Sequence, residues 1–150
     1  MRRTRRLLIA ALLAAAAVSC AEPNADLVVR TKEFSLEVTP SSARDGNVII
    51  DIDNTGKLNH ELVFARGDDP AKLALTPEGG VDLTKIVVAD RVNEFAPGRF
   101  RIISPDMRPG DYVLFCPIVG TDGQPGSHFQ QGMRTQFRIT ATVPQATDDL

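Results

Sequence analysis

Hydrophobic and polar residues alternate in several short segments of this 150-residue chain, and this alternation restricts the fold more than any other feature of the sequence. Residues 33–40 (EFSLEVTP) and 47–54 (NVIIDIDN) show the period of two that is typical of a strand with one buried face. Turn residues separate these segments, and helical periodicity is almost absent. The chain is therefore expected to be all-β.

Further segments show the same alternation. In residues 58–66 (LNHELVFAR) it places His60 on the same apolar face as Phe64. Residues 68–86 contain two prolines and a Gly-Gly pair, which indicates an insertion between strands with a short helix near Pro70–Leu75. The other expected strands are residues 85–95, 99–104, 112–118 and 133–143.

Seven or so short strands with turns between them predict one antiparallel β-sandwich or barrel over residues 27–143, followed by a polar tail at 144–150. An immunoglobulin-like domain also fits this pattern of strands. Its usual Cys-Trp-Cys core is impossible here, because the chain has no tryptophan and no second cysteine in the expected domain.

The first nineteen residues have the composition of an export signal, with a basic start (MRRTRR) and an apolar stretch (LLIAALLAAAAV) that is short for a membrane span. The end of this stretch, AVSC, resembles the lipobox of bacterial lipoproteins, although Ala17 stands where that motif more often has leucine. The resemblance implies that residues 1–19 are removed, that Cys20 carries a lipid, and that residues 20–26 are a tether. An uncleaved membrane helix is the alternative.

The charge of the remaining chain restricts its partners. Four of the 17 basic residues and none of the 19 acidic ones lie in residues 1–19, so the rest carries a net charge of about −6. This acidic balance argues against nucleic acid, whose phosphates need a basic surface. It is consistent with an exported domain that a lipid holds at the extracytoplasmic face of a bacterial membrane.

Residues that can bind a soft metal are scarce in the chain, and most of them lie close together. The two histidines are His60 and His128, and Cys116 is the one cysteine in the expected domain. Apart from the initiator, the methionines are Met107 and Met133. Two imidazoles, one thiolate and one distant thioether are the ligands of a type 1 copper site.

The segments that carry these residues resemble the cupredoxins, the small blue-copper proteins of the plastocyanin and azurin type. The resemblance lies in NTGKLNHELVF (54–64) and in PGDYVLFC (109–116) followed by HFQQGM (128–133). It implies a Greek-key β-sandwich of seven or eight strands that binds one copper ion. By position it assigns the ligands His60, Cys116, His128 and Met133.

The same resemblance implies a carrier of single electrons between redox partner proteins, and not an enzyme. Apolar residues near the methionine would tune the potential, and His128 would be the exit for the electron if its edge is exposed. The apolar residues are Phe115, Ile118 and Phe129.

Two features depart from the cupredoxin pattern. Eleven residues separate Cys116 from His128, whereas plastocyanin-like and azurin-like loops are far shorter. Many cupredoxins have an asparagine after the first histidine ligand that ties the ligand loops together. Here Glu61 occupies that position and Asn59 precedes the histidine.

Other functions stay open on the sequence alone. A copper-binding or copper-delivery lipoprotein would need the same ligands, and a metal-free interaction module could use the same fold. Asp51, Asp53, Asp68 and Asp69 could indicate calcium, but the first two alternate like the solvent face of a strand. A cysteine nucleophile activated by His128 would leave Met133 unexplained. A nucleophile elbow, a phosphate-binding glycine loop and a His-Glu-x-x-His motif are all missing.

Overall fold

The computed structural model describes residues 24–120 and 126–143, which form short β-strands and two 3-10 turns. The predicted signal at 1–19, the predicted lipid attachment at Cys20 and the predicted tail at 144–150 lie outside these ranges. In the part that is described, no helix is long and apolar enough to cross a membrane. The elements are β1 (Leu27–Lys32), β2 (Ser35–Thr39), β3 (Ser42–Arg44), β4 (Gly46–Asn47), β5 (Ile50–Asn54), β6 (His60–Arg66), η1 (Pro70–Lys72), η2 (Leu83–Lys85), β7 (Val88–Phe95), β8 (Phe100–Ile103), β9 (Asp106–Met107), β10 (Gly110–Phe115) and β11 (Arg134–Thr140).

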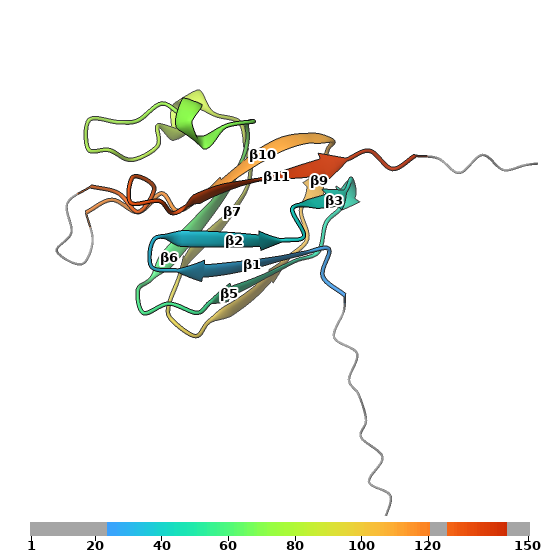
Figure 1. Ribbon diagram of the computed structural model, residues 1–150, viewed down its shortest axis with the longest axis horizontal. Coiled ribbons are helices and arrows are strands. Elements are labelled where there is room, and N and C mark those ends of the chain that lie inside the picture. The colour runs from blue at the N-terminus through green and yellow to red at the C-terminus, as the bar shows by residue number, and fades with distance from the viewer. Residues whose placement is uncertain (1–23, 121–125, 144–150) are drawn as a thin grey trace, which may run out of the picture.

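The strands form two packed sheets and one short extra pair. The first sheet has the order β2-β1-β5-β8, the second has the order β3-β11-β10-β6-β7, and β4 pairs with β9. In Figure 1 the first sheet lies in front of the second, and the β1–β2 turn and the β10–β11 loop lie at the same, left-hand end. The expectation of an all-β sandwich is confirmed.

The pairing of the strands corrects one detail of that expectation, because the sheets are not purely antiparallel. β1 pairs with β5 in parallel, and β3 pairs with β11 in parallel. Parallel neighbours need a connection that leaves the sheet and returns. Here the chain supplies it by passing from β2 to β3 in the second sheet before β5 returns to the side of β1.

The main core fills the space between the two sheets, and the period-two pattern explains which residues enter it. On β6 the side chains of Leu62 and Phe64 point into this core, as do Tyr112 and Leu114 on β10. The ring of Phe137 on β11 stacks on Tyr112 at 5.4 Å between centroids. The expected inward face of residues 58–66 is therefore confirmed.

A second apolar cluster covers the outer face of β6 and β10. It contains Val63, Ala65, Val113 and Phe115, whose side chains point away from the main core. Strands that are buried on both faces read as continuous apolar runs, which explains why YVLFC shows little alternation. The cluster is completed by residues outside these strands, namely Leu73, Val81, Leu83, Ile86 and Phe129.

The insertion that the sequence predicted between β6 and β7 is the cover over this outer face. The helix expected near Pro70–Leu75 is a single 3-10 turn at Pro70–Lys72, with Asp69 as its N-cap, and a second turn follows at Leu83–Lys85. In Figure 1 the insertion is the green and yellow-green segment above the β10–β11 loop. Its residues Leu73, Val81, Leu83 and Ile86 are therefore part of a core, whereas Leu75 is exposed.

Asn54 connects the end of β5 to the segment that leads into β6. Its buried side-chain nitrogen Nδ2 donates to the Leu58 carbonyl at 2.9 Å and to the Phe95 carbonyl at 3.2 Å. Its Oδ1 accepts from the Gly56 backbone N–H at 3.0 Å. One side chain therefore holds the 55–59 turn against the end of β7.

We expect Asn54→Ala to lower the free energy of unfolding by about 1–3 kcal/mol, because it leaves buried carbonyl groups without a donor. Urea denaturation followed by circular dichroism measures this change. Asn93→Ala, at an exposed position of β7, is the matched control and should stay within about 0.5 kcal/mol of wild type. Equal effects of the two substitutions would contradict the role given to Asn54.

Candidate metal centre

The second sheet places His60 and Cys116 at the same end of the molecule. His60 is the first residue of β6, and Cys116 directly follows β10. β6 and β10 are antiparallel neighbours, with Phe115 opposite Val63, so one strand begins where the other ends. The backbone N–H of Glu61 points at the cysteine and lies 3.5 Å from its Sγ.

The chain after Cys116 returns to the same end and brings His128 with it. The His128 backbone N–H donates to the Ile118 carbonyl at 2.9 Å, and the Met133 N–H donates to the His128 carbonyl at 2.9 Å. The Cys116 N–H donates to the Met133 carbonyl at 3.1 Å. These bonds fix the two ends of the long loop relative to each other.

The result is a buried cluster of one sulfur and two imidazoles. One potential ligand atom from each of His60, Cys116 and His128 lies within 4.8 Å of the others. Cys116 Sγ is 3.3 Å from His128 Nδ1, and the two imidazole centroids are 5.4 Å apart with planes at 69°. All three side chains are at most 1% exposed. A soft sulfur beside two nitrogens is a donor set suited to copper.

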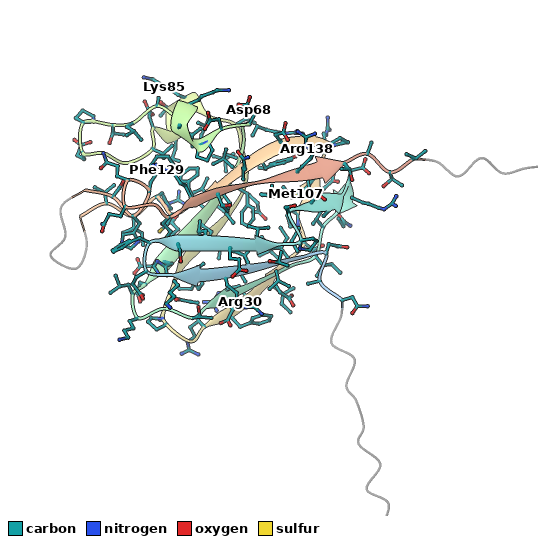
Figure 2. The ribbon with its side chains drawn as sticks, in the orientation of Figure 1. Arg30, Asp68, Lys85, Met107, Phe129 and Arg138 are labelled. Carbon is teal, nitrogen blue, oxygen red and sulfur yellow. The ribbon has the colours of Figure 1, made fainter. Side chains whose placement is uncertain are left out.

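Of the two methionines in the described domain, Met133 is the one at this end. It is fully buried, and its backbone is bonded to both His128 and Cys116. Met107 belongs to β9 and packs in the main core. Figure 2 shows Met107 well away from Phe129, the neighbour of His128. The axial position predicted for Met133 stays a prediction that this placement favours.

The surroundings of Cys116 keep its sulfur protonated when no metal is bound. Burial raises the pKa of the thiol to about 11, although the N–H groups of Glu61 and Ile118 act in the opposite direction. The carboxylates of Glu61 and Glu94 raise it further. Since a metal binds the thiolate, metal binding at this site releases a proton.

The turn between β1 and β2 covers both imidazoles with consecutive residues. A carboxylate oxygen of Glu33 lies 3.8 Å from His60 Nε2. The ring of Phe34 meets His128 edge-on, at 5.3 Å between centroids and an angle of 74°. Phe34 has a φ of 48°, in the left-handed region that bulky residues rarely adopt. Residues of an expected strand (33–40) therefore form part of the site.

The insertion contacts the segment that carries His128. The buried Ser127 hydroxyl donates to the Gly79 carbonyl at 2.6 Å and accepts from the Gln130 N–H at 3.1 Å. With Phe34 on one side and this contact next to it, the His128 side chain is only 1% exposed. The condition for a direct electron exit, an exposed edge of His128, is not met.

The asparagine of the cupredoxin pattern also has no counterpart at Asn59. Its side chain donates to Glu94 Oε1 at 2.6 Å in an exposed position. Glu61, which replaces that asparagine, pairs with Arg91 on β7. The side chain that holds the turn before the first histidine is Asn54, which the sequence did not single out because an asparagine at a strand end usually signals only a turn.

Comparison with solved structures identifies the fold. Reduced auracyanin from Roseiflexus castenholzii matches with a TM-score of 0.53 and 18% identity, over 77% of this chain and 95% of that chain. The azurin Az-iso2 from Methylomonas sp. strain J matches with a TM-score of 0.51 and 14% identity, over 77% and 96% of the two chains. No protein-family model and no curated protein matches the sequence.

These matches show the fold of the domain. Azurin is a cupredoxin, and the arrangement of the two sheets here is the cupredoxin fold. The chain combines this fold with a buried His-Cys-His cluster at the end where β6 begins and β10 ends.

We expect Cys116 to be unreactive toward iodoacetamide at neutral pH in the metal-free folded protein, because its thiol is fully buried and has a raised pKa. A Cys20→Ser variant leaves Cys116 as the one thiol, and mass spectrometry measures its alkylation. Unfolding in guanidinium chloride should make alkylation rapid. Equally rapid labelling of the folded variant would contradict the burial of the sulfur.

Proposed function

We propose that this protein is an exported type 1 copper protein that carries single electrons between redox partner proteins. The observation that supports the proposal most directly is the buried cluster of His60, Cys116 and His128, with Met133 beside it, on a cupredoxin fold. A copper ion held there supplies a one-electron change between Cu(II) and Cu(I). The four side chains are its proposed ligands.

The protein would keep the geometry of these ligands nearly constant while the charge of the site changes. His60 and Cys116 are fixed by paired neighbouring strands, and His128 and Met133 by backbone hydrogen bonds to the same end. A packed interior moves little when one charge is added. Small movement means a small reorganisation energy, which suits electron transfer.

An electron would enter or leave through the cover of the site, because His128 itself does not reach the surface. The Phe34 ring packs against the His128 ring in a T-shaped contact and is partly exposed, so it would link the imidazole to the solvent. A redox partner would then dock over the β1–β2 turn. In this proposal the electron leaves through Phe34, and not through an exposed edge of the His128 imidazole as expected from the sequence.

Anchoring and export belong to the same proposal. Cys20, the predicted lipidation site, precedes the first strand by six residues, 21–26, which would serve as the tether. A lipid there would hold the domain at the extracytoplasmic face of a membrane, where its partners would reside. We propose that the metal only carries electrons and that no substrate is converted there.

The burial of the donors favours the carrier over the alternative of copper delivery. A delivery protein has to pass its metal to a partner's ligands, which requires at least one accessible donor. Here His60, Cys116 and His128 are all at most 1% exposed. A site of this kind favours retention of the metal.

We expect the protein to develop an intense visible thiolate-to-copper charge-transfer band on addition of Cu(II), with narrow hyperfine splitting in the EPR spectrum. Cys116→Ser should abolish the band, because the thiolate is its source. Met133→Gln should retain the colour and change the potential, because an axial ligand tunes the couple.

Cys20→Ser is the matched control for the cysteine substitution and should leave the band unchanged. An unchanged spectrum in Cys116→Ser would show that the ligand assignment is wrong. Rapid copper loss to a mild chelator from the wild-type protein, without a blue species, would instead favour copper delivery.

We expect Phe34→Ala to speed copper loss to a chelator and reduction by a small anionic reductant, because it uncovers the edge of His128. Phe34→Gly should do the same and be more stable than Phe34→Ala by about 1 kcal/mol, since glycine tolerates the φ of 48°. Stopped-flow absorbance and urea denaturation measure these effects. Rates equal to wild type in both variants would exclude Phe34 as the cover.

A further inference from the structure

The residue before Phe34 makes a second contact with the site that the sequence did not predict. Glu33 lies in the turn between β1 and β2, and its carboxylate faces Nε2 of the His60 imidazole. We propose that Glu33 is a positioning residue for His60: its charge favours the imidazole tautomer with the proton on Nε2 and so leaves Nδ1 to bind the metal. This inference rests on the proposed function.

The choice of tautomer follows from the distance between Glu33 and His60 and from the burial of the imidazole. Glu33 Oε1 lies 3.8 Å from His60 Nε2, while the imidazole is fully buried and the carboxylate is 27% exposed. An N–H facing a carboxylate is attractive, whereas a bare ring nitrogen facing it is repulsive. In a buried setting this difference is larger than in water. The arrangement therefore selects one of the two neutral tautomers of His60.

The carboxylate is held in this place by the segment before His60. Its Oε1 accepts hydrogen bonds from the backbone N–H groups of Lys57 and Leu58, the latter at 2.8 Å. A Cβ atom on Gly56 would overlap the carboxylate, so the glycine leaves the space that Glu33 fills. The acid is thus part of a built contact and not a side chain that happens to pass the histidine.

Within the described residues, the ionisable side chain that faces Glu33 is the His60 imidazole, and no lysine or arginine pairs with this carboxylate. Its negative charge is therefore not cancelled by a neighbouring cation. Outer carboxylates of this kind orient a ligating histidine and raise its donor strength. They also favour the more positively charged metal state, so Glu33 should lower the reduction potential.

The test compares Glu33→Ala with Glu37→Ala, its matched control. Glu37 is an exposed carboxylate on β2, so both variants lose one negative charge from the same hairpin. The first readout needs no copper: the ¹⁵N chemical shifts of His60 in the metal-free protein report which nitrogen carries the proton. We expect the Nε2–H form in wild type and Glu37→Ala, and a shift toward the Nδ1–H form in Glu33→Ala.

The second readout is Cu(II) affinity, which should fall by about 10- to 100-fold in Glu33→Ala and hardly change in Glu37→Ala. The reduction potential should rise in Glu33→Ala. Gly56→Ala, which pushes the carboxylate away and keeps its charge, should move the tautomer and the affinity in the same direction. It also keeps the proposal testable if Glu33→Ala does not fold.

Failure of this inference and failure of the proposed function can be told apart. If wild type binds no copper but Glu33→Ala changes the His60 tautomer, the electron-carrier proposal fails and the positioning role stands. If wild type forms the blue site, but Glu33→Ala and Glu37→Ala show the same tautomer, affinity and potential, Glu33 is not a positioning residue.

Discussion

The burial of one sulfur and two imidazoles against one another is the constraint on which the rest of this structure depends. A buried polar group destabilises the fold unless a polar partner faces it. Each of these side chains must therefore be held where a neighbouring group can interact with it. Cys116 Sγ lies 3.3 Å from His128 Nδ1 and faces the Glu61 N–H, while His60 faces Glu33. The antiparallel pairing of β6 with β10 supplies two of the three positions.

The parts of the fold that the sequence predicted well are those with strong local patterns. The alternation in residues 58–66 and the apolar run before Cys116 correspond to β6 and β10. The parallel pairs β1–β5 and β3–β11 could not be predicted, because pairing between distant strands leaves no periodic signal. Strands of two or three residues, such as β3, β4 and β9, are too short to show a period and read as turns.

In the candidate site, too, some residues could be predicted from the sequence and others could not. His60, Cys116 and His128 could be predicted as ligands because such residues are rare in the chain and stand at the ligand positions of the cupredoxin pattern, and the structure brings them together. The cover was missed, because Glu33 and Phe34 alternate with their neighbours as strand residues do. Phe34 lies in the turn with a left-handed φ, and a bulky residue gives no sign of that conformation in the sequence. The ligands can therefore be predicted from the sequence, but the residues that cover them are set by the packing of distant segments.

The insertion between β6 and β7 stabilises the long loop between Cys116 and His128. Eleven residues between Cys116 and His128 cost more conformational entropy to order than a short loop does, and they need more contacts to stay closed. The insertion provides such contacts through the Gly79–Ser127 hydrogen bond and through the outer apolar cluster. In that cluster Phe115, before the cysteine, meets Phe129, after the histidine, at 5.7 Å between centroids. The outer cluster therefore fixes the two ends of the loop, and with them the spacing of the sulfur and the imidazole.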